Sequence, residues 1–150
     1  MDEQRAEAAE REYQRACKAL DSGNVLAALL LLEAALRQQD NPQWHAMLGY
    51  CVARERGQVA RGTELCRSAL EQFPENPEHY YYYARLLLMA GQKAEAVQVL
   101  RQGLAHGESP AILNLLQELG TRKPPPIRWL HRNNPLNKYL GILLARAGLR

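Results

Sequence analysis

The sequence predicts an all-α fold, a right-handed helical-repeat solenoid with a capping helix at its C-terminal end. The evidence is an internal repeat of 34 residues, apolar residues at helical spacing, and glycine or proline where the expected helices end or begin. The repeat appears in four columns: Gly23, Gly57 and Gly91; Ala28, Gly62 and Ala96; Ala35, Ala69 and Gly103; Leu36, Leu70 and Leu104. A fixed period of this length indicates stacked helical units that bury their apolar faces against one another.

The first and second units have less regular opening helices than the third. In the first unit, about residues 9–42, few apolar residues mark this helix, which is typical of a terminal repeat with an outer face in water. In the second unit, about residues 43–76, the apolar residues are Trp44, Met47, Leu48 and Cys51. The distance along the chain from the small residue Gly49 to the turn glycine is one residue longer than the corresponding distance in the third unit. The register of this helix therefore stays open by one residue.

The third unit, about residues 77–110, shows the helical pattern most clearly. Pro77 is suited to the first turn of a helix, where its missing N–H is no loss. Gly91 is suited to the left-handed turn that ends a helix. The apolar face between them consists of Tyr80, Tyr83, Ala84 and Leu87. After the turn, a second helix carries an apolar face of Ala96, Val97, Leu100, Gly103 and Leu104.

One further helix and a C-terminal extension follow the three units. Ser109 and Pro110 predict an N-cap and a first helical residue, so an extra helix is expected over residues 110–119, within a repeat domain of residues 1–120. Three consecutive prolines favour an extended connector over residues 121–133. Residues 134–150 carry leucines at helical spacing and are expected to form the capping helix.

Charge is distributed unevenly along the chain. Residues 1–110 hold 12 basic and 15 acidic residues, a net charge of −3, whereas residues 111–150 hold seven basic residues and one acid, a net charge of +6. The basic segment suits an anionic membrane surface or another polyanion, or it is simply a solvated helix face. Nucleic acid is not expected as a partner.

Composition and motifs argue against several classes of function. No run approaches the ~18 apolar residues of a membrane span, and the charged first twelve residues do not resemble a signal peptide. Three cysteines without CxxC spacing and four scattered histidines predict neither a disulfide framework nor a metal site, so a cytoplasmic location is expected. We find no phosphate loop, nucleophile elbow or paired carboxylates, and therefore predict no catalysis and no cofactor.

The unit of aromatic residue, small residue, turn glycine, second small residue and Ala-Leu pair resembles the tetratricopeptide repeat. The best-matching residues are Tyr80, Tyr83, Ala84, Leu87, Gly91, Ala96, Leu100, Gly103 and Leu104. The resemblance covers about residues 9–110 and implies a binding surface for peptides and protein partners. It does not identify the partner, because the family includes chaperones, secretion adaptors and assembly scaffolds.

The resemblance also implies a binding site, because in this family the first helices of successive repeats line a concave groove. Two pairs fall on that face, Tyr50 with Arg54 and Tyr81 with Arg85, each one helical turn apart. Tyrosine gives a large contact area, and arginine can hold a carboxylate with two parallel hydrogen bonds. We predict a peptide-binding groove at these four residues; the alternative is that the tyrosines lie between core and surface and the arginines are solvated.

Some members of the family hold a C-terminal carboxylate with a clamp of Lys, Asn and Arg. The corresponding region of this first repeat has Tyr13, Cys17 and Asp21, and the aspartate would repel that ligand. The function predicted is a non-enzymatic adaptor, scaffold or chaperone-like module that binds a peptide segment of a partner. The alternative is a peripheral anionic-membrane or polyanion-binding protein acting through the basic C-terminal segment, and self-association is left open.

Overall fold

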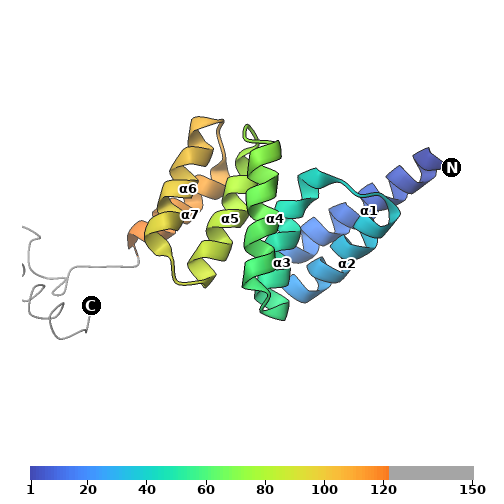
Figure 1. Ribbon diagram of the computed structural model, residues 1–150, viewed down its shortest axis with the longest axis horizontal. Helices are drawn as coiled ribbons and strands as arrows, with labels where there is room; N and C mark the ends of the chain where they lie inside the picture. The colour runs from blue at the N-terminus through green and yellow to red at the C-terminus, as the bar shows by residue number, and fades with distance from the viewer. Residues whose placement is uncertain (122–150) are drawn as a thin grey trace, which may run out of the picture. The chain divides into compact units, whose positions relative to one another are not determined.

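The computed structural model of the chain describes residues 1–121 (Figure 1), which are helical and contain no strand. The helices are α1 (Asp2–Asp21), α2 (Val25–Gln38), η1 (Pro42–Trp44), α3 (His45–Arg56), α4 (Val59–Gln72), α5 (Pro77–Met89), α6 (Lys93–Ala105) and α7 (Pro110–Thr121). The predicted all-α helical-repeat fold is confirmed. The expected connector, from its second residue on, and the capping helix at 134–150 lie outside the described residues.

Consecutive helices pair into three hairpins, α1 with α2, α3 with α4 and α5 with α6. Neighbouring hairpins also pack on each other, through α2 against α3, α3 against α5, and α4 against α5. All three hairpins belong to one compact unit of residues 1–112. The three repeats therefore share a continuous core, as a stacked array requires.

The hairpin turns are made by the repeating glycines. Gly23, Gly57 and Gly91 have φ angles of +82°, +68° and +79°, which glycine adopts without the steric cost that a Cβ would add. Asparagine caps the helix starts in the second and third repeats: the side-chain oxygen of Asn41 accepts a hydrogen bond from the N–H of Gln43, and Asn76 caps α5 in the same way. The local signals in the sequence thus set where each hairpin begins and turns.

The extra residue in the second repeat is accommodated at the end of its first helix. α3 continues to Arg56, directly before Gly57, whereas α5 ends at Met89, two residues before Gly91. In the second repeat the first helix therefore continues closer to the turn glycine than it does in the third repeat. This resolves the register that the sequence left open.

The second column of small residues lies where the two helices of each hairpin approach. Ala28, Gly62 and Ala96 are all buried, one on the second helix of each repeat. A Cβ at Gly62 would lie only 3.0 Å from Ala53 Cβ and 3.0 Å from Leu86 Cδ1, so this position has no room for a side chain. Close helix packing explains why the column holds only alanine and glycine.

Polar contacts tie the hairpins to one another. Arg56 donates two hydrogen bonds to Glu33, at 2.9 and 2.6 Å, and so joins the first and second repeats. These hydrogen bonds hold the pKa of the Glu33 carboxyl below its usual range, against the opposing effect of burial. Between the second and third repeats, His79 Nε2 lies 3.1 Å from the carbonyl oxygen of Gln43.

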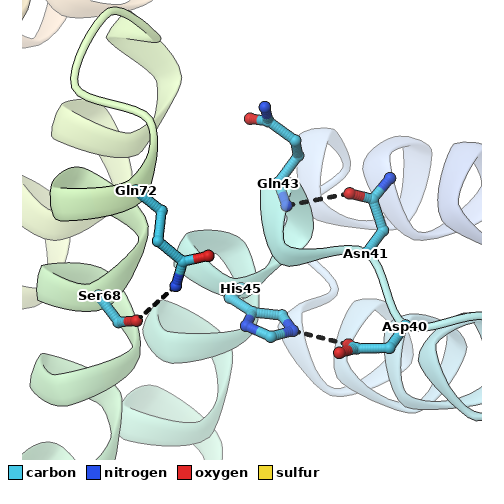
Figure 2. A network of polar contacts seen from close by, with 6 residues as sticks. All are labelled: Asp40, Asn41, Gln43, His45, Ser68 and Gln72. Carbon is cyan, nitrogen blue, oxygen red and sulfur yellow. Dashed lines mark hydrogen bonds and ion pairs between the residues drawn. The ribbon is translucent and has the colours of Figure 1, made fainter.

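The connection between α2 and α3 is held by local polar contacts, which Figure 2 shows from close by. His45 Nε2 lies 2.7 Å from Asp40 Oδ1, and the N–H of Gln43 donates to Asn41 at 3.0 Å. The side chain of Gln43 in turn accepts a hydrogen bond from Asn76 at 3.2 Å. The start of α5 is therefore fixed against the start of the second repeat, which positions the two first helices that carry the site.

Candidate peptide-binding site

The four predicted site residues lie together on two adjacent helices. Tyr50 and Arg54 are one turn apart on α3, and Tyr81 and Arg85 are one turn apart on α5. Because α3 packs against α5, the two pairs meet across the helix contact. We call Tyr50, Arg54, Tyr81 and Arg85 the tyrosine–arginine cluster.

The hydroxyl oxygen of Tyr50 is the centre of this cluster. Arg85 Nη2 donates to it at 2.8 Å, and Arg54 Nη1 lies 3.5 Å away, at the outer limit of a hydrogen bond. The guanidinium of Arg85 also lies over the ring of Tyr50, 4.2 Å from its centroid, and 5.6 Å from the centroid of Tyr81. These contacts fix Arg85 by a hydrogen bond and by attraction of its charge to the ring face.

The members of the cluster differ in exposure, and this separates their roles. Tyr50 is only 2% exposed, whereas Arg85 and Tyr81 are half-buried and Arg54 is exposed. Arg54, Arg85 and Tyr81 are therefore accessible from solvent. Tyr50, which the sequence suggested as a contact residue, instead lies beneath the arginines and supports them.

Neither arginine of the cluster is paired with a carboxylate in residues 1–121. Arginines of this part of the chain that do pair with a carboxylate include Arg15, with Glu12, and Arg56, with Glu33. Arg54 and Arg85 instead share a neutral hydroxyl group. The cluster is thus a local concentration of positive charge on a surface partly open to solvent.

A second cluster, not predicted from the sequence, lies on the same set of first helices. The ring of Tyr13 on α1 stacks on Trp44 at 4.4 Å, with only 8° between the ring planes. The phenol groups of Tyr13 and Tyr82 lie near the carboxyl group of Glu78 on α5, and Cys17 lies beside Tyr13. We call Tyr13, Cys17, Trp44, Glu78 and Tyr82 the tyrosine–glutamate cluster.

Desolvation dominates the electrostatics of the tyrosine–glutamate cluster. Glu78 is exposed as a residue, but its carboxyl group lies among neighbouring side chains, and loss of hydration raises its pKa above the usual range. His79 and the hydroxyl groups of the two nearby tyrosines oppose this rise. Burial is also the main reason that the pKa values of Tyr13 and Tyr82 are raised.

The two clusters touch through aromatic rings. Tyr82 lies 6.3 Å from Tyr50 and 5.3 Å from Tyr81, measured between ring centroids. The one-turn spacings of Tyr13 with Cys17 and of Glu78 with Tyr82 are the only signals in the sequence that point to the second cluster. They could not show that the two pairs meet each other and Trp44, because the members come from three separate elements. The first helices thus carry a continuous set of aromatic rings, of which Trp44, Tyr50 and Tyr82 are buried, with arginines at one part and a carboxyl group at another.

The described residues offer little for catalysis or metal binding. No group of three or more His, Cys, Asp or Glu side chains in residues 1–121 is arranged to hold a metal ion. Burial raises the pKa of Cys51 to about 12 and that of Cys66 to about 12. Both thiols therefore stay protonated near neutral pH and are poor nucleophiles. In the same part of the chain, none of the helices has both the length and the apolar character needed to cross a bilayer.

Stacked helical hairpins of this kind define a helical-repeat protein. Comparison with protein families agrees: two family models, both described as tetratricopeptide repeat, match residues 13–61 and 53–119. The chain belongs to the tetratricopeptide repeat family. Comparison with curated proteins gave no match. Tetratricopeptide repeats generally mediate protein–protein interaction and are typically non-enzymatic.

Proposed function

We propose that this protein is a cytoplasmic adaptor or scaffold that holds a peptide segment of a partner protein against the surface formed by α3 and α5. The observation that carries the proposal is Arg85, a half-buried arginine fixed by Tyr50 and paired with no carboxylate in residues 1–121. An arginine held in this way has already lost much of its side-chain freedom, so less entropy is lost when a partner binds. Tyr81 beside it adds aromatic contact area.

The basic segment of residues 111–150 supports a second candidate, binding to an anionic membrane surface. Its net charge of +6 would attract anionic lipids, with a strength that falls as salt screens the charges. The two candidates use different parts of the chain. They can therefore be separated by variants of α5 alone.

The test compares the proteins that the full chain retains from its native host with those retained by Arg85→Gln. The matched control is Arg101→Gln, which removes the same charge from an exposed position on α6. We expect one or more partners to be lost with Arg85→Gln and kept with Arg101→Gln. Equal retention by all three proteins, together with salt-sensitive flotation on phosphatidylserine vesicles, would favour the membrane candidate instead.

A further inference from the structure

We propose that the tyrosine–arginine cluster recognises a single Asp or Glu side chain within an internal segment of the partner. This inference rests on the proposed function and adds the chemistry of the residue that is recognised. The ligand of the surface formed by α3 and α5 is then an extended segment of the partner that places one carboxylate at the cluster.

The first argument is the crowding of positive charge. Arg54 and Arg85 approach the same oxygen atom, at 3.5 and 2.8 Å, so their two guanidinium groups are close neighbours. Like charges at such a separation repel each other. An anion bound between them is attracted to both, and these two attractions outweigh the repulsion. The hydroxyl group of Tyr50 cannot do this, because it is neutral.

The second argument is the hydrogen-bonding capacity that remains. A guanidinium group has five N–H donors, and Arg85 uses one on Tyr50 among the described residues. Stacking over Tyr50 sets the position of the group before any ligand arrives. By contrast, Arg56 donates two hydrogen bonds to the carboxylate of Glu33. A carboxylate bound to Arg85 could accept two hydrogen bonds in the same way.

The third argument concerns which carboxylate fits. The chain's own residues 111–150 carry a net charge of +6 and would be repelled by the cluster. Glu78 lies two helical turns before Arg85 on α5, beside Tyr82, which contacts Tyr50. A ligand with several adjacent carboxylates, such as an acidic chain end, would be repelled by Glu78. Charge complementarity therefore favours a segment that brings a single carboxylate to the cluster.

The experiment selects binders to the full chain from a random library of short peptides that are acetylated at the N-terminus and amidated at the C-terminus. We expect the selected peptides to share one Asp or Glu. For the strongest binder, replacing that residue by its amide should weaken binding by about 10- to 100-fold, the loss expected for a hydrogen-bonded charge pair. Arg85→Gln should cause a similar loss, and Arg101→Gln none.

Tyr50 acts on the ligand only through the arginines, so its variant tests positioning. Tyr50→Phe keeps the buried ring and removes the hydroxyl group that both arginines approach. We expect it to weaken binding of the acidic peptide and to leave binding of the matched amide peptide unchanged. A purely structural role would weaken both peptides equally.

Three results would overturn the inference in distinguishable ways. Peptides that share no acid, but whose binding is weakened by Arg85→Gln and not by Arg101→Gln, would leave the proposed function standing and exclude a carboxylate as the recognised group. Binders found only when the library has free C-termini would assign the cluster to a chain end instead. If neither library yields a binder to the wild-type chain, both the inference and the proposed function fail.

Discussion

Gly49 on α3 and Gly62 on α4 face each other so closely that neither position can carry a side chain. A Cβ built on Gly49 would lie 2.6 Å from the carbonyl oxygen of Gly62, and one built on Gly62 would meet the carbonyl oxygen of Gly49. The obstacle on both sides is backbone, which cannot rotate away as a side chain can. The contact therefore sets how closely the two helices of the second repeat approach, and α3 is the helix that carries Tyr50 and Arg54.

Gly62→Ala should destabilise the protein by about 1 to 3 kcal/mol, the usual cost of overpacking a well-packed contact, although alanine is the better helix former. The free energy of unfolding from urea denaturation measures this. The control is Thr63→Ala at the next residue of α4. Thr63 is half-buried, and this substitution introduces the same alanine side chain without the clash. Equal stability of both variants would mean that the two helices are free to move apart.

Gly57→Ala should also destabilise, through backbone conformation rather than packing. Gly57 has a φ of +68° and no atom within 4 Å of a built Cβ, so space is not the obstacle. The left-handed conformation costs an L-residue about 1 to 2 kcal/mol, and asparagine tolerates it better than alanine. We expect thermal denaturation to rank the melting temperatures as wild type, then Gly57→Asn, then Gly57→Ala. A reversed order of the two variants would argue against this cause.

Tyr50→Ala should lower stability by about 3 to 5 kcal/mol, the range seen when a large buried ring is removed. The reason is burial, since Tyr50 is only 2% exposed. Tyr50→Phe keeps the ring and should cost only about 1 kcal/mol for the lost hydrogen bonding. Chemical denaturation of the two variants separates these effects. If Tyr50→Ala were as stable as Tyr50→Phe, the ring would not be part of the core.

Glu78→Gln should stabilise the protein at neutral pH and have no such effect in acid. The pKa of Glu78 is raised in the folded protein, chiefly by desolvation, so ionisation of this group opposes folding. The wild type is therefore fully stable with respect to this group below the ordinary carboxyl pKa of about 4.3, and loses stability as the pH rises through the higher folded value. The advantage of the glutamine variant should grow over the same interval and then stay constant.

Melting temperatures recorded from acid to neutral pH test the Glu78 prediction. Glu75→Gln is the matched control, because it removes an exposed carboxylate three residues away. It should show no comparable pH-dependent gain. A gain for Glu78→Gln that is equally large at low pH would point to packing rather than ionisation.

The sequence by itself determined the helical hairpins and the positions of their turns. Proline at the start of α5 and glycine at 34-residue intervals act within a few residues along the chain, so their effects can be read without tertiary contacts. The spacing of Tyr81 and Arg85 is of the same kind, because one helical turn brings them onto one face. The one-residue shift in the second repeat stayed open, since the end of α3 depends on its packing as well as on Gly57.

The tertiary structure alone decided which side chains from different helices meet. Arg85 lies over Tyr50, 35 residues earlier in the chain, and Tyr13 on α1 reaches Glu78 on α5. Helical periodicity predicts the face on which each residue lies, but not the rotation and offset with which successive hairpins stack. Those depend on contacts between hairpins, such as the one at Gly62 of α4, where a Cβ would lie 3.0 Å from Leu86 Cδ1 on α5. The same packing turned Tyr50 from an expected contact residue into the buried support of two arginines.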